Sequence, residues 1–225
     1  MDHRLAIIIV GFSFLAFARC GQSVHPVTQA LSPLYEQVQT ISSNADCLGP
    51  DGGYLTNVTE ADNGHLLFEQ SFTYKSDDFR VRIEQDSIGY LLDSLDQTLD
   101  TLTASVAWII RSHHFHKMAA QPLDFFQAAE KEAEQTDPQG EWYTGKDPNG
   151  NGVRFRIYPI KQRLERMEVL NPDNPDEVIS ITYHSFLQTV YGPMAQRVDI
   201  KQGNEATYIF QFKSIVVNGE EMLVG

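Results

Sequence analysis

The chain is poor in cysteine and in positive charge, and both shortages exclude classes of protein. Its 225 residues include two cysteines, too few for a zinc site built from cysteine alone. Lysine and arginine total 17 against 30 aspartates and glutamates, which gives a formal net charge of −13. This balance favours solubility and repels nucleic acid and anionic membrane surfaces, so we expect no nucleic-acid partner.

Signature motifs of common enzymes are also absent from the sequence. It contains no GxSxG nucleophile elbow, no P-loop and no GxGxxG dinucleotide-binding motif. The carboxylates are numerous and scattered, and no pair stands out as a general acid and base. The sequence therefore predicts no catalytic residues and no cofactor, and it favours a non-enzymatic protein.

Long apolar runs are missing except at the N-terminus. Arg4 precedes the apolar run Leu5–Phe17, and Ala16 and Ala18 then place small residues at the −3 and −1 positions of a cleavage site. A membrane-spanning helix needs roughly 20 apolar residues, so this run is too short for an anchor. We predict a signal peptide over residues 1–18 and export to the periplasm, cell envelope or exterior, without a transmembrane anchor after cleavage.

The two cysteines, Cys20 and Cys47, have two interpretations. In an oxidising compartment they are predicted to pair, and the closed loop would stabilise the fold by roughly 3–4 kcal/mol. Alternatively, Cys20 is the lipidated first residue of a bacterial lipoprotein, and Cys47 is then a free thiol. Arg19 disfavours lipidation, because that processing requires a small residue immediately before the cysteine.

Residues 19–225 have the length of a single domain. Residues 19–47 are predicted to hold an amphipathic helix and a linker, with Ser32 and Pro33 resembling an N-cap and the first helical position. The apolar stripe of this helix has spacings of three and four residues, and it consists of Val27, Leu31, Leu34, Val38 and Ile41.

Two blocks of antiparallel strands flank a predicted helical insert. Strands are expected over residues 54–86, where Asn63-Gly64 indicates a hairpin, and over residues 153–218. Between them, apolar spacing predicts helix from Ile88 onward, and the alanines and glutamates of Asp124–Gln135 favour a second helix. We therefore expect an α+β domain in which a helical insert over residues 88–135 covers one face of the sheet.

Three histidines, His113, His114 and His116, are candidate metal ligands because imidazole is the commonest metal-binding side chain. No carboxylate lies at a recognised spacing from them, so the sequence favours a polar cluster at the rim of the core and no metal. A metal-dependent hydrolase that uses this cluster remains an alternative.

Aromatic residues are concentrated on the predicted strands and the insert. They either fill an ordinary core or, together with the helices, enclose an apolar cavity. The candidate ligand-binding residues are Phe68, Phe72, Phe79, Trp108, Phe115, Phe125, Phe126, Tyr183, Phe210 and Phe212.

The order of elements resembles that of the periplasmic lipoprotein-carrier superfamily, the LolA-like proteins. The resemblance covers the exported N-terminus, the helix Val27–Ile41, the strands Tyr54–Glu84, a helical plug over Leu91–Gln135 and the strands that end at Val217-Asn218. It implies a mostly antiparallel sheet curved into a half-open β-barrel, with helices over a cavity that accepts acyl chains.

The leading hypothesis is therefore an exported carrier or binding protein for an apolar or acylated ligand such as a lipid. The alternative from a different class is a secreted interaction module, or a structural module of the envelope, whose aromatic face is only a filled core. The sequence leaves the oligomeric state open.

Overall fold

A computed structural model describes residues 24–73, 78–84, 88–133, 140–170, 178–203 and 206–222. The predicted signal peptide over residues 1–18 and the predicted disulfide partner Cys20 lie outside these ranges. None of the helices within the ranges combines the length and the apolarity needed to cross a bilayer.

Most of the described chain belongs to one antiparallel sheet. Its strands are β1 (Ile41–Gly49), β2 (Gly52–Glu60), β3 (Leu66–Phe72), β4 (Phe79–Glu84), β5 (Ile88–Leu92), β6 (Thr98–Leu102), β7 (Gln127–Lys131), β8 (Glu141–Lys146), β9 (Gly152–Tyr158), β10 (Arg163–Leu170), β11 (Val178–Thr189), β12 (Gly192–Gln202), β13 (Ala206–Val217) and β14 (Glu220–Met222).

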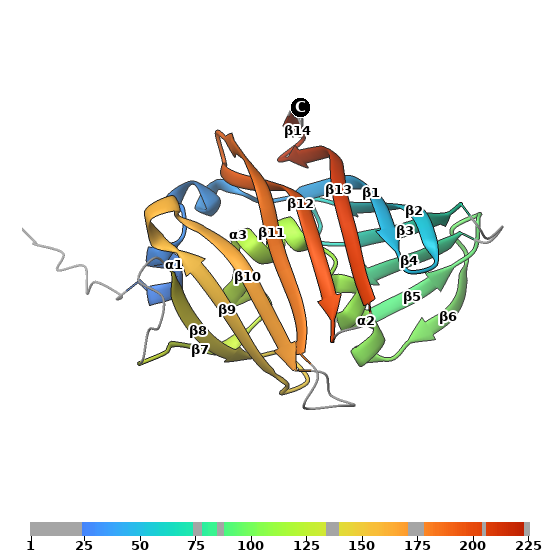
Figure 1. The fold of residues 1–225 in the computed structure, drawn as a ribbon. Helices are drawn as coiled ribbons and strands as arrows, with labels where there is room; N and C mark the ends of the chain where they lie inside the picture. Colours follow the sequence, from blue (N-terminus) through green and yellow to red (C-terminus); the bar gives the residue numbers. More distant parts are fainter. Residues whose placement is uncertain are drawn as a thin grey trace, which may run out of the picture.

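The sheet is curved but not closed. Its strand order is β6-β5-β4-β3-β2-β1-β13-β12-β11-β10-β9-β8-β7, and β14 pairs with β13. The path thus begins and ends on two edge strands, β6 and β7, which lie at opposite sides of the molecule in Figure 1. The predicted half-open antiparallel barrel is confirmed.

Local irregularities help the strands to bend. The register of β1 against β13 shifts between Asn44 and Ala45, and that of β10 against β9 shifts between Leu164 and Arg166. On β11, Ser185 adopts a positive φ of 51° between two regions of regular pairing with β12. Such bulges increase twist and bend a strand, which curls the sheet around its inner face.

The helices are short and lie on the inner side of the curved sheet. They are α1 (Pro26–Ala30), α2 (Ala104–Arg111) and α3 (Phe115–Ala120), with 3₁₀ turns η1 (Pro33–Gln37), η2 (Pro122–Asp124) and η3 (Pro159–Lys161). In Figure 1, α3 lies behind β11 and β12, and α2 lies between β13 and the strands β5 and β6. α2 contacts β4 and β5, whereas α3 contacts β10 and β12.

The predicted N-terminal helix is wrong as a continuous element. The chain forms only α1 and η1, with Leu31 and Ser32 extended between them, and β1 already begins at Ile41. Pro33 interrupts the helix because its nitrogen has no hydrogen to donate to the preceding turn. Ser32 does act as an N-cap, for η1, by accepting from the backbone N–H of Leu34 at 3.4 Å. The apolar stripe still predicts burial, since Val27, Leu31, Val38 and Ile41 are all buried.

The predicted helical insert over residues 88–135 is wrong over most of its length. Its first part forms the hairpin of β5 and β6, which extends the sheet from β4, and only α2 and α3 are helical. The spacing of Ile88, Leu91 and Leu92 fits a helix, but in strand β5 Leu92 is buried and Ile88 is exposed. Thr98 and Thr101 are β-branched residues suited to a strand.

Residues 127–131 form an edge strand in place of the predicted second helix. β7 pairs with β8, and the register shifts between Gln127 and Glu130, where Ala128 has a positive φ of 50°. Ala129 is the one buried residue of this strand. Helix propensity is a weak preference, and here tertiary pairing overrides it.

The predicted hairpin at Asn63-Gly64 is confirmed. β2 and β3 pair from Tyr54 opposite Phe72 to Glu60 opposite Leu66. Gly64 has a positive φ of 79° and donates its N–H to the carbonyl of Ala61 at 2.8 Å. The loop is longer than a two-residue turn, because the last strand pair lies outside Ala61 and His65.

Two clusters of buried apolar residues lie on the inner face. The larger one joins α1, η1 and α3 to the strands from β7 to β13 and to β1. The smaller one joins α2 to strands β2–β5 through residues such as Phe68, Val81 and Ile110.

Candidate functional site

A cavity of about 720 Å³ lies between the inner face of the sheet and the helices α2 and α3. Its lining is mainly apolar. The apolar and aromatic lining residues include Tyr54, Phe72, Trp108, Phe115, Met118, Phe126, Val153, Met167, Val169, Ile179, Ile181, Ile200, Tyr208 and Phe210.

The strand wall of the cavity is built from rows of side chains that cross the sheet. Pairing places Met167 opposite Ile181, Ile181 opposite Ile200, and Ile200 opposite Tyr208. The same row continues to Phe155, which pairs with Met167. Residues that pair directly across a sheet point to the same face, so five neighbouring strands give one continuous apolar band. We call this band, Phe155-Met167-Ile181-Ile200-Tyr208, the apolar row.

A second row contributes aromatic rings. Phe72 pairs with Tyr54, Tyr54 with Cys47, and Cys47 with Phe210. The rings of Tyr54 and Phe72 lie 5.6 Å apart, and Phe210 meets Phe115 of α3 edge-on at 5.0 Å. The aromatic side of the cavity is therefore held by ring contacts between sheet and helix.

Five of the ten aromatic candidates from the sequence line the cavity, namely Phe72, Trp108, Phe115, Phe126 and Phe210. They come from β3, β13, α2, α3 and the turn before β7. The ring of Trp108 packs against Phe126 at 6.1 Å, which joins α2 to the far side of the barrel.

The other five candidates lie away from the cavity lining. Phe68 is buried in the smaller cluster, and Phe79 packs against that cluster. Phe125, Tyr183 and Phe212 are buried in the larger cluster. The structure thus separates the candidates into cavity rings and core rings.

Sequence reasoning missed the aliphatic wall of the cavity. Val169, Ile179, Ile181 and Ile200 were not candidates, yet they line the cavity from β10, β11 and β12. A signal existed for two of them, because Ile181 lies between Ser180 and Thr182, and Ile200 lies between Asp199 and Lys201. Alternation alone shows which residues share a face, but not whether that face meets a core or a cavity.

Several polar residues of the lining lie, together with Pro50, where strands end. This group, which we call the rim, consists of Pro50, Asp51, Asp147, Asn149, Asn151 and Gln202. Asp147 is buried, and its carboxylate accepts the backbone N–H of Asn151 at 2.8 Å and the amide Nδ2 of Asn151 at 2.9 Å. The rim is thus shaped by the β1–β2 turn, the β8–β9 turn and the end of β12.

The three candidate metal ligands bind three different backbone carbonyls. His113 Nδ1 lies 2.9 Å from the Ile109 oxygen, His114 Nε2 lies 2.7 Å from the Ile41 oxygen, and His116 Nε2 lies 2.8 Å from the Ala195 oxygen. Burial lowers the pKa of His114 to about 3 and that of His116 to about 4, so both rings are neutral at pH 7. Within the described ranges, no three His, Cys, Asp or Glu side chains converge as a metal site would require.

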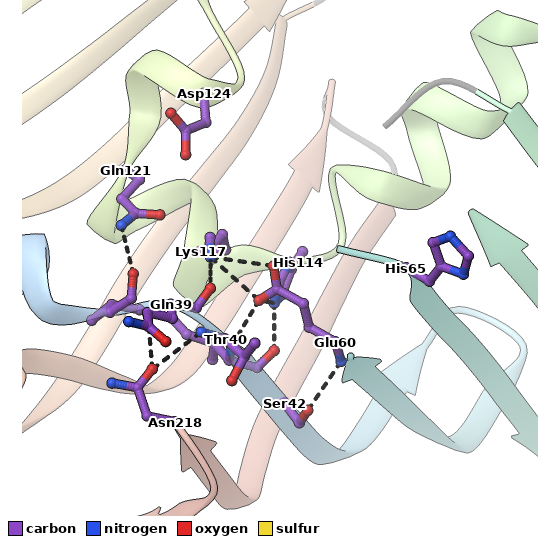
Figure 2. A network of polar contacts seen from close by, with 12 residues as sticks. Gln39, Thr40, Ser42, Glu60, His65, His114, Lys117, Gln121, Asp124 and Asn218 are labelled. Carbon is purple, nitrogen blue, oxygen red and sulfur yellow. Dashed lines mark hydrogen bonds and ion pairs between the residues drawn. The ribbon is translucent and has the colours of Figure 1, made fainter. Parts of the chain in front are cut away.

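A polar network fixes α3 to the start of the sheet (Figure 2). Lys117 Nζ lies 3.2 Å from Glu60 Oε1, and Glu60 Oε2 accepts the backbone N–H of Ile41 at 2.8 Å. Lys117 also donates to the carbonyl of Gln39, and His114 bonds Ile41 as above. Glu60 and Lys117 are 13% and 12% exposed, so this ion pair is only weakly screened by solvent. The network holds the helix that forms one wall of the cavity.

Cys47 is buried on the inner face of β1, and within the described residues no disulfide joins it. Burial raises its pKa to about 12, and its Sγ lies 3.3 Å from the Thr56 hydroxyl. Because Cys20 lies outside the described residues, the Cys20–Cys47 bridge stays a prediction.

Comparison with known proteins reveals solved structures of similar fold but no match at the level of sequence. No protein-family model and no curated protein sequence matches the chain. A LolA superfamily protein from Nitrosomonas europaea matches with a TM-score of 0.59 at 8% identity, over 84% of this chain and 89% of that one. The fold is that of a LolA-like protein.

Two further solved structures support this LolA-like fold. A DUF1329 family protein from Desulfovibrio piger has a TM-score of 0.56 at 9% identity, over 82% of this chain and 88% of that one. A putative outer membrane lipoprotein-sorting protein domain from Vibrio parahaemolyticus has a TM-score of 0.55 at 8% identity, over 85% and 89%. The likeness covers most of each chain, and it concerns the fold alone.

Proposed function

We propose that this protein is an exported, non-enzymatic carrier or binding protein for an apolar or acylated ligand in the cell envelope. The observation that carries the proposal is the cavity of about 720 Å³. It is lined by four members of the apolar row, Met167, Ile181, Ile200 and Tyr208, and by the rings of Tyr54, Phe72, Trp108, Phe115, Phe126 and Phe210. The LolA-like fold supports it, since one neighbour of that fold is described as a lipoprotein-sorting domain. The predicted signal peptide supplies the location.

The mechanism is burial of hydrocarbon on a preformed apolar surface. Each methylene group moved from water into such a site contributes about 0.8 kcal/mol, so a chain of twelve contributes about 10 kcal/mol in total. Association costs on the order of 4–15 kcal/mol in lost freedom of motion, which leaves a net affinity that depends strongly on chain length. Within the cavity, each added methylene should tighten binding about fourfold.

Native mass spectrometry of the purified full-length protein tests whether it carries a ligand from the cell. Bound species with the mass of a lipid or another acylated molecule support the carrier. In parallel, isothermal titration of n-alkyl maltosides with eight to fourteen carbons, each below its micelle concentration, should show the fourfold steps. The steps should end where the chain no longer fits.

The same experiments separate the carrier from a module with a filled core. A protein without bound lipid, and with an affinity for maltosides that does not change with chain length, contradicts the carrier. A matched control is the denatured protein, which exposes the same apolar residues without the cavity and should show no such limit to chain length.

Export has its own test. N-terminal sequencing of the protein secreted by a host should begin at Arg19, and a mass increase of two hydrogens on reduction would support the Cys20–Cys47 bridge. A blocked, lipid-modified Cys20 at the N-terminus would favour the lipoprotein alternative.

A further inference from the structure

The polar end of the cavity lies at one edge of the sheet. Gln202 pairs with Ile179, Ile179 with Val169, and Val169 with Val153, so β12, β11, β10 and β9 all reach this edge together. The turn between β8 and β9, which carries Asp147, follows directly on this edge. Figure 1 shows the ends of these strands next to one another along the lower edge of the sheet. An amphiphile whose chain lies against the apolar row would therefore place its headgroup among the rim residues.

The opposite end of the cavity region is covered by packed side chains. Tyr35 of η1 is 4% exposed, and its hydroxyl donates to the carbonyl of Pro193 at the start of β12. Gly192 has a positive φ of 104°, and an added Cβ there would lie 2.8 Å from the Tyr35 ring. The close approach of η1 to β12 fills this end of the inner face, whereas the rim at the other end offers polar groups to a headgroup.

Charge at the rim has one sign. Asp51 is exposed and Asp147 is 3% exposed, and both belong to the cavity lining. Asp147 accepts hydrogen bonds only from neutral groups of Asn151 in the described structure. No lysine or arginine lies among the lining residues that the structure describes. His113, which also lines the cavity, has its pKa lowered by burial and adds no positive charge at pH 7.

We propose that the cavity takes amphiphiles whose headgroup is cationic or uncharged, and that the rim discriminates against anionic headgroups. This inference rests on the proposed carrier function and names its substrate class. A phosphate or carboxylate at the rim would face two carboxylates, and the described residues of the lining offer no lysine or arginine to offset them. An ammonium or a hydroxyl-bearing headgroup can instead interact favourably with the carboxylates and the amides of Asn149, Asn151 and Gln202.

The test holds the chain constant and varies the headgroup. Dissociation constants of dodecyltrimethylammonium, dodecyl maltoside and dodecyl phosphate are measured by isothermal titration at pH 7.5, each below its micelle concentration. The phosphate should bind at least about tenfold more weakly than the maltoside, which equals ~1.4 kcal/mol, and the ammonium at least as tightly as the maltoside. Raising the salt concentration should bring the three dissociation constants closer together, because salt screens charges at a rim that is open to solvent.

Two variants connect the selectivity to the rim. Asp51→Asn should improve binding of dodecyl phosphate severalfold and so narrow the ratio between the phosphate and maltoside dissociation constants. Asp46→Asn is the matched control, since Asp46 lies on the same strand–turn unit but is exposed on the outer face and paired with Lys213 at 2.7 Å. It makes the same change in net charge and should leave all three affinities unchanged.

The outcomes separate this inference from the carrier function. Equal affinities for the three amphiphiles, or preference for the phosphate, overturn the headgroup selectivity while the carrier stands. An Asp46→Asn effect as large as that of Asp51→Asn also overturns it, since net charge and not the rim would then decide. Failure of all three amphiphiles to bind contradicts the carrier itself.

Discussion

Replacing Ile200 with tryptophan distinguishes an open cavity from a filled core. Ile200 lies in the apolar row between Ile181 and Tyr208, and its side chain lines the cavity. It is only partly buried, although it belongs to the inner face of a long central strand. A larger side chain at this position has the cavity in front of it.

The expected effect on ligand binding follows from the methylene groups that the indole ring displaces. If the ring occupies the place of about three methylenes, an alkyl ligand loses about 2.4 kcal/mol of binding free energy, and its dissociation constant rises roughly 50-fold. The free energy of unfolding without ligand should change by less than about 1 kcal/mol, because the ring enters existing space. In a filled core, the same substitution would destabilise the fold by about 1–3 kcal/mol.

The assay combines urea unfolding, followed by circular dichroism, with isothermal titration of dodecyl maltoside. Thr207→Trp is the control, since Thr207 is exposed on the neighbouring strand β13 and points to the outer face. It should alter neither quantity. Full affinity in a folded Ile200→Trp protein would refute the assignment of the cavity as the ligand site, and a large loss of stability would favour the filled core.

Three further predictions concern the stability of the scaffold. Burial lowers the pKa of His114 and His116 below the usual value near 6.5, so the unfolded state binds more protons than the folded state. The free energy of unfolding should therefore be highest above pH 6.5 and fall as the pH drops toward 4, by up to about 1.4 kcal/mol per pH unit for each ring. Urea midpoints measured against pH test this expectation. Glu60→Gln should cost about 3 kcal/mol by chemical unfolding, because it leaves the nearly buried Lys117 ammonium unpaired. Gly192→Ala should cost about 2–3 kcal/mol, since it combines a positive φ with a contact to the Tyr35 ring.

Controls for these predictions come from the same chain. Glu69→Gln removes a partner of Arg80 in a more exposed ion pair and should cost less than about 1 kcal/mol. Gly150→Ala keeps the cost of a positive φ, here 86°, but nothing lies within 4 Å of the added Cβ, so it should cost less than Gly192→Ala. A His116→Gln protein with an unchanged pH dependence, or a Glu60→Gln protein as stable as Glu69→Gln, would contradict the corresponding argument.

Local patterns in the sequence were sufficient for much of the sheet. The alternation in β4 and β9 and the Asn63-Gly64 turn depend on neighbouring residues only, and the structure confirms them. Segments 88–102 and 127–131 could not be assigned in this way. The apolar spacing of the first segment and the alanine and glutamate content of the second suit a helix, and strand pairing with β4 and β8 decides their conformation.

The candidate site shows the same division. Composition indicated an acidic domain rich in aromatic residues, and the apolar stripe from Val27 to Ile41 indicated which side chains are buried even where no continuous helix forms. Only the tertiary structure decided which rings face the cavity, because Phe72 and Phe210 meet through Tyr54 and Cys47 across four strands. Register between strands far apart in the chain sets these contacts, and register depends on the whole sheet and not on any one segment.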